Sequence, residues 1–163
     1  MSVNPQTVAR VGELLGRNPR GMEAVAVSGP CGEPRVIRVA SLVEDEPFPT
    51  LFWLVDPDAV YHIDGLEAGG LIAELQGRVD ASGPLREAMA GDHRAHIALR
   101  DSLMSESVRR RLAELGYDDV LAEKGIGGIA DFTRIRCLHT WYAAHLVVPN
   151  TIGALLEPFL QGR

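Results

Sequence analysis

The side chains that could do chemistry in this chain are concentrated in one segment of its last third. Cys137 is followed by His139 and His145 and is preceded by Arg134 and Arg136. We expect a lowered pKa at this thiol, because the N-terminal dipole of a helix and nearby guanidinium charges both favour the thiolate. A thiolate beside imidazole rings can attack an electrophile or bind a soft or borderline metal ion such as zinc or iron. Cys137 and His139 are therefore the predicted catalytic residues.

The spacing of these residues limits which of them can converge. On a continuous α-helix, Cys137 and His145 lie roughly 80° apart, and His139 lies roughly 200° from Cys137. The three side chains can therefore not all point one way on a regular helix. A helix that begins at or after Cys137 would let Cys137 and His139 meet at its end. The alternative is a buried free cysteine with two histidines hydrogen-bonded to the backbone.

Two further side chains could contribute to a metal site. Asp56 follows an apolar segment and precedes Pro57, where a carboxylate could bind metal, although Asp before Pro is also typical of turns and helix caps. His93 and His96 are three residues apart on a predicted helix, which brings their side chains together. The alternatives are a hydrogen-bonded core histidine for His96 and a solvated helix face for His93, which neighbours Asp92. The predicted metal-binding set is Asp56, His93, Cys137, His139 and His145.

A glycine-rich loop, residues 125–128, precedes the reactive segment. Backbone N–H groups in such a loop can bind an anion, so Gly127 and Gly128, together with Arg134 and Arg136, would suit an anionic and for example phosphorylated substrate. The loop is not a Walker motif, since no Gly-Lys-Ser/Thr follows it. A flexible connection between elements explains the same glycines.

The elements that must position these residues follow from apolar periodicity and turn formers. Pro5 opens a helix whose apolar residues recur at helical spacing. Two β-rich segments, 24–27 and 36–40, are separated by the turn formers of residues 28–34 and predict a hairpin. The segment 50–55 is apolar on both faces, which is typical of a central strand covered on each side.

From residue 58 onward the pattern is helical. Pro84 opens a longer helix, and Asp131 is the predicted N-cap of a helix that runs to about Val148. We predict a single α+β domain over residues 1–163, with a helical layer packed on the sheet. Residues 5–56 supply a helix and a small, about three-stranded, antiparallel sheet, and residues 58–163 are mainly helical.

The composition of this 163-residue chain limits the classes of partner that it is expected to bind. With 46% hydrophobic and 23% charged residues, the composition is typical of a globular protein. The formal net charge of −6 argues against nucleic-acid binding. No signal peptide is visible, and the longest apolar stretches, 51–55 and 143–148, are too short to cross a bilayer. We expect a cytoplasmic protein without membrane contact, whose cysteines, Cys31 and Cys137, are free thiols or ligands. No feature fixes an oligomeric state.

Segments spread over nearly the whole chain resemble the bacterial domain-of-unknown-function 501 family, and the most specific of them is Arg136-Cys137-Leu138-His139. The resemblance implies a small cytoplasmic bacterial protein and brings no established reaction. Family members often carry Cys or His where this chain has Asp56, which adds weight to that position as a ligand. They tend to place a cysteine where this chain has Gly29, so Cys31 is displaced from the family pattern. The matching segments are residues 18–21, 48–54, 65–71, 125–128, 136–139 and 142–146.

Two classes of function remain open. The first is a metal-binding or thiolate-based hydrolase or transferase for a small anionic substrate, with its site centred on residues 137–139. The second is a non-catalytic regulatory module that docks another cytosolic protein, with Cys137 and the histidines in structural roles. The absence of a complete catalytic signature in the sequence favours the second class, as do Trp141 and Tyr142, which could form part of a docking surface.

Overall fold

The computed structural model describes residues 3–161, and its first element is helix α1 (Pro5–Leu15). Asn4 accepts a hydrogen bond from the N–H of Gln6, Pro5 occupies the first turn, and Gly16 ends the helix in the left-handed conformation with φ 69°. The sequence predicted a helix opened by Pro5, and this prediction is confirmed.

The sheet that follows is antiparallel, with strand order β1-β2-β5. Strands β1 (Met22–Ser28) and β2 (Pro34–Val39) form the predicted hairpin, and β5 (Phe52–Leu54) pairs with β2. The prediction that segment 50–55 forms a central strand is wrong, since β2 is central and β5 ends the sheet within the described residues. The segment is apolar on both faces because helices cover both faces of the sheet. This apolar pattern carries no information about which strands pair with it.

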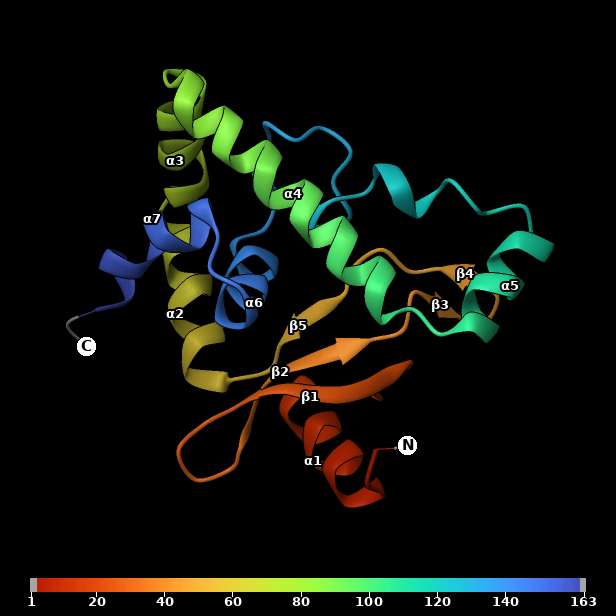
Figure 1. The fold of residues 1–163 in the computed structure, drawn as a ribbon. Coiled ribbons are helices and arrows are strands. Elements are labelled where there is room, and N and C mark those ends of the chain that lie inside the picture. Colours follow the sequence, from red (N-terminus) through yellow and green to blue (C-terminus); the bar gives the residue numbers. More distant parts are fainter. Residues whose placement is uncertain (1–2, 162–163) are drawn as a thin grey trace.

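The two faces of the sheet contact different helices (Figure 1). Val11 of α1 packs with Ile37, Val39 and Val55 on one face. Phe52 and Leu54 point to the other face, where they join the main core around α6 (Leu138–Val147). A short second hairpin, β3 (Leu42–Val43) and β4 (Glu46–Pro47), leads into β5.

The rest of the chain is helical, so the predicted α+β class, with a small antiparallel sheet and a helical layer, is confirmed. The long helix α4 crosses over the layer formed by its neighbours (Figure 1). The remaining helical elements are α2 (Pro57–Ala68), α3 (Leu71–Asp80), α4 (Gly83–Leu103), α5 (Glu106–Glu114), the 3₁₀ turns η1 (Leu121–Glu123) and η2 (Ile126–Gly128), and α7 (Thr151–Leu160).

Helix α6 begins later than predicted. Asp131 does not cap it, because its carboxylate accepts hydrogen bonds from the N–H and the hydroxyl of Thr133 and closes a local turn. Gln76 of α3 then bonds to both sides of the following segment, donating to the carbonyl of Thr133 and accepting from the N–H of Ile135. These two bonds hold the segment extended, so the helix starts at Leu138 with Cys137 in the N-cap position.

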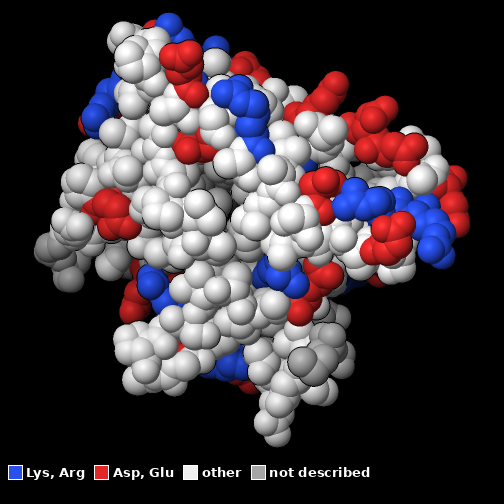
Figure 2. All heavy atoms as spheres, viewed as in Figure 1, with Lys and Arg blue, Asp and Glu red and all other residues white. Residues whose placement is uncertain are grey.

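Within residues 3–161, no single helix is long and apolar enough to cross a membrane. Helices α6 and α7 together have enough length and apolar character, but they are bent by 101° relative to each other. On the face seen in Figure 2, acidic and basic side chains are interspersed around α5 rather than separated into regions of one sign. Arg109 and Arg111 of that helix are paired with Asp101 and Asp45.

Candidate functional site

Helix α2 supplies a carboxylate to the N-terminus of α6. Oε2 of Glu67 accepts a hydrogen bond of 2.9 Å from the N–H of Leu138, the first residue of α6. Cys137 holds the N-cap position, but its side chain makes no capping hydrogen bond. Its backbone carbonyl accepts a hydrogen bond of 2.9 Å from the hydroxyl of Thr140. The thiol therefore lies at a helix N-terminus, where the helix dipole favours a negative charge.

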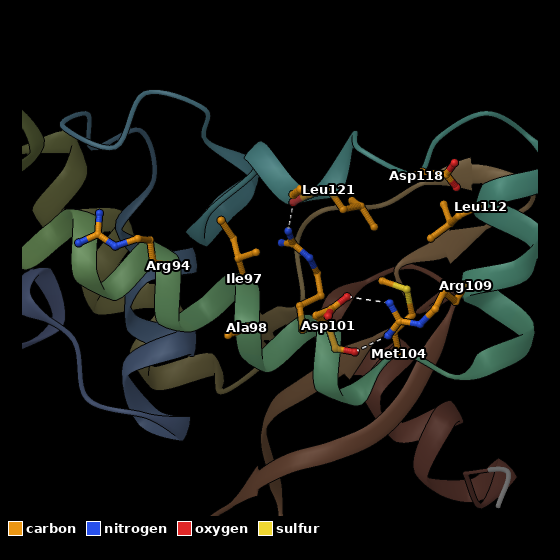
Figure 3. A pocket seen from close by; sticks show the side chains of 11 residues that line it. Arg94, Ile97, Ala98, Asp101, Met104, Arg109, Leu112, Asp118 and Leu121 are labelled. Atoms are coloured by element: carbon orange, nitrogen blue, oxygen red, sulfur yellow. Dashed lines mark hydrogen bonds and ion pairs between the residues drawn. The ribbon is translucent and has the colours of Figure 1, made fainter.

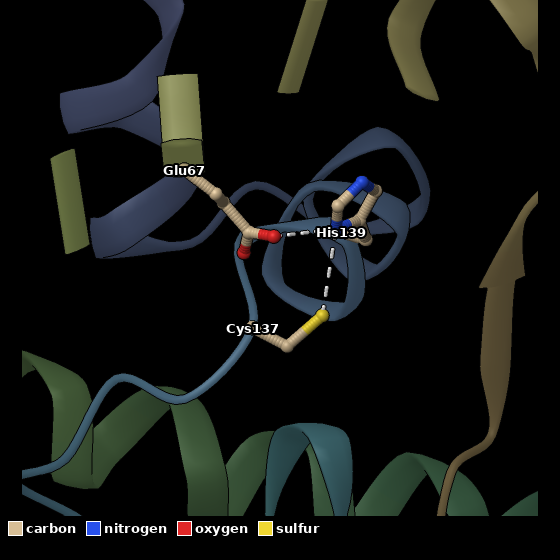
Figure 4. A group of neighbouring side chains, drawn as sticks. All are labelled: Glu67, Cys137 and His139. Atoms are coloured by element: carbon tan, nitrogen blue, oxygen red, sulfur yellow. Dashed lines mark hydrogen bonds and ion pairs between the residues drawn. The ribbon is translucent and has the colours of Figure 1, made fainter. Parts of the chain in front are cut away.

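The ring of His139 lies between this cysteine and the carboxylate of Glu67 (Figure 4), and it also contacts the carboxylate of Asp64. Its Nδ1 lies 3.6 Å from Sγ of Cys137 and 3.2 Å from Oε1 of Glu67. Its Nε2 lies 2.8 Å from Oδ1 of Asp64, one turn earlier on α2. Both ring nitrogens therefore face groups that can carry a negative charge.

The pKa values of the cysteine and histidine respond to this contact. The pKa of His139 is raised to about 9, chiefly by its hydrogen bond to Cys137, against the opposing effect of burial and with help from the charges of Cys137 and Glu67. Burial of the Cys137 thiol raises its pKa, but the hydrogen bond to His139, the N–H of Thr140 and the imidazolium charge together leave that pKa below its usual value. The thiolate–imidazolium pair is thereby favoured over the neutral pair.

Of the predicted metal-binding residues, the structure brings together Cys137 and His139. Among residues 3–161, the one group of three or more His, Cys, Asp or Glu side chains with ligand atoms within 4.8 Å of one another is Glu67, Cys137 and His139. The remaining predicted ligands, Asp56, His93 and His145, lie outside this group.

Each of those three side chains has protein partners of its own. Asp56 caps α2 by accepting from the N–H groups of Asp58 and Ala59, and it pairs with Nε of Arg35 at 2.7 Å. Nδ1 of His93, a fully buried ring, accepts from the N–H of Ile126 at 3.0 Å. Nδ1 of His145 accepts from the N–H of Asn150 at 3.0 Å, and its Nε2 lies 3.3 Å from Glu157 of α7.

The glycine-rich loop packs directly against the start of α6. Gly127 and Gly128 have φ values of 70° and 75°, and a Cβ atom on Gly127 would lie 2.7 Å from Oγ1 of Thr140. The N–H of Gly128 donates to the carbonyl of Gly125, which occupies one amide of the proposed anion cradle. Arg134 and Arg136 are exposed, and Nε of Arg134 lies 3.9 Å from Asp131.

Sequence reasoning missed Asp64 and Glu67. They are three residues apart, so one face of α2 presents both carboxylates, and this spacing was the available signal. Nothing local connects them with a cysteine some seventy positions later. Only the packing of α2 against α6 brings the two pairs into contact.

A cleft of about 530 Å³ adjoins the cluster. Polar groups in its wall come from Arg17, Thr50, Asp64, His139 and Thr140. The other lining residues, most of which belong to α1, β5 and α2, are apolar. Large apolar clefts with a few converging polar groups and perturbed pKa values are the usual location of ligand sites.

A second cavity, of about 440 Å³, lies between α4, α5 and η1 (Figure 3). Two of its arginines are held by the protein itself: Arg109 bonds to the carboxylate and carbonyl of Asp101, and the buried Arg100 donates to backbone carbonyls including that of Leu121. Its other charged lining residues, Arg94 and Asp118, belong to no metal-ligand group, since the one such group within residues 3–161 is Glu67, Cys137 and His139. We therefore place the candidate site at Glu67, Cys137 and His139.

The sequence profile of the family described as Protein of unknown function (DUF501) matches residues 25–157, which include every residue of the candidate site. No curated protein and no solved structure matches the chain. Because the profile covers most of its length, the chain belongs to the DUF501 family.

Proposed function

We propose that Glu67, Cys137 and His139 bind a divalent transition-metal ion of the zinc type, and that the protein uses it for hydrolysis or group transfer on a small molecule. The observation that carries this proposal is the position of Nδ1 of His139, which lies 3.6 Å from a sulfur and 3.2 Å from a carboxylate oxygen. One imidazole nitrogen therefore faces two other ligand atoms at the same time.

These separations match the edges of a tetrahedral site. Zinc–sulfur bonds of about 2.3 Å and zinc–nitrogen or zinc–oxygen bonds of about 2.0–2.1 Å place sulfur and nitrogen roughly 3.6 Å apart, and nitrogen and oxygen roughly 3.4 Å apart. The separations of 3.6 and 3.2 Å in the protein fall close to these values. A cysteine, a histidine and a glutamate are also the three types of zinc ligand found in proteins.

The surroundings of the three ligands support the same interpretation. Nε2 of His139 contacts Asp64, the arrangement in which an outer carboxylate fixes the orientation of a metal-bound imidazole. Oε2 of Glu67 accepts from Leu138, which leaves Oε1 directed at the cluster. A divalent cation would also compensate the negative charge of the Glu67 carboxylate and a Cys137 thiolate, which one imidazole alone cannot fully do.

Three protein ligands leave a coordination position open, where zinc acts as a Lewis acid and activates water. We infer an anionic substrate from Arg134 and Arg136, which are exposed and shortly precede Cys137 in the sequence. The cysteine ligand requires reducing conditions, so we place the protein in the cytoplasm.

The test is metal analysis of protein purified without an affinity tag. We expect about one equivalent of zinc or iron per chain in the wild type, and at least a tenfold lower content in the ligand variants Cys137→Ser, His139→Gln and Glu67→Gln. Cys31→Ser is the matched control, because it removes the exposed cysteine outside the cluster and should retain the metal. A wild type that binds no stoichiometric zinc or iron after incubation with either ion would refute the proposal.

Enzymatic use of the metal needs a separate measurement. We expect the metal-loaded protein to cleave at least one member of a panel of chromogenic phosphate and carboxylate esters, to lose that activity in EDTA, and to regain it with zinc. The Cys137→Ser variant should fold normally and remain inactive. Unchanged metal content with no cleavage of any ester would leave the metal centre in place and argue against its catalytic use.

A thiolate nucleophile is the second candidate, because Cys137, His139 and Asp64 form a continuous line of contacts with the imidazole in the middle. This is the order of nucleophile, base and orienting group in covalent catalysis. Sγ of Cys137 would form a bond to an acyl carbon, the leaving group would depart with a proton from His139, and water would then cleave the thioester. Metal-free protein should in that case alkylate faster with iodoacetamide at Cys137 than at Cys31, by mass spectrometry.

The non-catalytic alternative treats the same residues as structural. It expects Cys137→Ser to lower stability without any loss of bound metal or activity, and it requires a cytosolic protein that binds the wild type. The metal analysis and the stability of Cys137→Ser therefore separate the enzyme from the docking module.

A further inference from the structure

Strand β5 presents unpaired backbone groups at the edge of the sheet. Its hydrogen bonds to β2 involve alternate residues: the carbonyl of Leu51 accepts from Val39, and the N–H of Val55 donates to Arg35. The N–H and C=O groups of Phe52 and Leu54, the residues between, therefore point away from β2. Within residues 3–161, no strand lies beyond β5 and no other group bonds to these four.

The cleft of about 530 Å³ runs along this edge. Leu14 and Leu15 of α1 form one side of it, and Val60 and Tyr61 of α2 contribute to the other. The side chain of Tyr61 is 75% exposed, although it is large and apolar. Both sides of the cleft are thus largely apolar, and Phe52 and Leu54, which are 4% and 7% exposed, line it between them.

We propose that this cleft, which we call the β5 groove, binds a peptide segment in extended conformation as an additional strand beside β5. A strand supplies N–H and C=O groups in alternation and with the repeat of β5, so it can satisfy both Phe52 and Leu54. Its side chains point alternately to the α1 and α2 sides, and both sides favour apolar residues.

The chemistry of the groove favours a peptide over other occupants. A lipid chain or an aromatic small molecule would cover the apolar walls but leave the backbone groups of β5 unpaired, which is costly in a buried site. The groove also contains Arg17, whose guanidinium lies 4.5 Å from the centre of the Trp53 ring and has no carboxylate partner within the described residues, whereas Asp64 is already paired with His139. A peptide with an acidic side chain complements Arg17.

This binding surface goes beyond the proposed metal centre and does not require it. His139 and Asp64 line the groove, but the groups that would hold the peptide are the edge of β5 and the walls from α1 and α2. Peptide affinity is therefore expected to be the same in EDTA and in Cys137→Ser, which removes a proposed metal ligand outside the groove.

The first test is selection of a phage-displayed library of random heptapeptides against the full chain. Leu14→Arg and Tyr61→Arg place a charged side chain in the groove, and because Tyr61 is exposed we expect Tyr61→Arg to keep the wild-type fold. Val120→Arg is the matched control, since Val120 is an exposed apolar residue outside the groove. Selected peptides should bind the wild type and Val120→Arg equally, and both groove variants about tenfold more weakly.

The second test is N-methylation of a selected peptide, measured by fluorescence anisotropy. Methylating the alternate amides that face β5 should weaken binding about tenfold, and methylating the other amides should change it less than about twofold. Equal effects of the two sets, or no peptide enriched on the wild type over both groove variants, would overturn the proposal. Self-association of the wild type that Tyr61→Arg abolishes would also overturn it, because a second copy would then occupy the groove.

Discussion

Glu67 accepts the first backbone N–H of α6 from Leu138 at 2.9 Å, so a carboxylate on one helix caps another helix. The same carboxylate contacts His139 through its second oxygen. The cap and the proposed metal site therefore share one side chain, and substitutions can separate the two roles.

Replacing Glu67 tests the cap. We expect Glu67→Ala to lower the free energy of unfolding by about 1–2 kcal/mol, because the N–H of Leu138 loses its acceptor, whereas Glu67→Gln retains an acceptor oxygen and loses about half of that or less. Urea denaturation of metal-free protein gives both values. Equal destabilisation by Ala and Gln would mean that the charge rather than the hydrogen bond stabilises the helix start.

Much of the fold could be predicted because local signals determine it. Pro5 and Gly16 delimit α1, and the turn formers between β1 and β2 specify the hairpin. The start of α6 could not be predicted, because Gln76, a residue of α3, holds the preceding segment extended and overrides the capping preference of Asp131. The edge position of β5 depends on strand order, on which its apolar pattern carries no information.

The candidate site divides in the same way. Cys137 and His139 could be identified from their side-chain chemistry and their closeness to a helix start. Asp64 and Glu67 could not, because they are ordinary acidic residues on a helix until α2 packs against α6. Asp56 shows the converse: its position before a proline suited both a ligand and a cap, and in the structure it caps α2 and binds Arg35.

The glycine of α7 should respond to alanine in the opposite direction from a glycine of α3. A Cβ atom on Gly153 would lie 2.1 Å from Cγ of His145, whereas a Cβ on Gly77 would meet nothing within 4 Å. We expect Gly77→Ala to stabilise the protein by about 0.5–1 kcal/mol, because alanine loses less backbone entropy in a helix, and Gly153→Ala to destabilise it by about 2 kcal/mol or more. Thermal denaturation of both variants checks the prediction. A stabilising Gly153→Ala would show that α6 and α7 can move apart at this contact at little cost in free energy.

Arg100 is expected to be one of the largest single contributors to stability. Its side chain is fully buried and donates to the carbonyls of Pro49, Leu121 and Lys124, which joins α4 to two loops. Arg100→Met should lower the free energy of unfolding by about 3 kcal/mol or more, because those buried carbonyls lose their donor. Arg94→Met, an exposed position on the same helix, should change it by less than about 0.5 kcal/mol. Similar effects of the two substitutions would contradict this role.

Stability should fall as the pH decreases below neutrality because of two buried histidines on α4. Burial lowers the pKa of His93 to about 4, and Asp92 only partly opposes this; burial, followed by the charges of Arg100 and His93, lowers the pKa of His96 to about 4. In the unfolded chain both titrate near their ordinary pKa of about 6.5, so between these values the unfolded state binds more protons. The contribution of these two neutral histidines to the free energy of unfolding is fully present above about pH 6.5. It is lost as the pH falls toward 4, by up to about 3 kcal/mol for each histidine.

Urea denaturation between pH 8 and pH 4.5 measures this dependence. His96→Leu removes one of the two titrating rings together with a buried Nε2 that has no hydrogen-bond partner within the described residues. The variant should therefore show a shallower loss of stability with decreasing pH than the wild type, whatever its stability at pH 8. A wild-type slope equal to that of His96→Leu would mean that this ring accepts its proton in the folded protein as readily as in the unfolded chain.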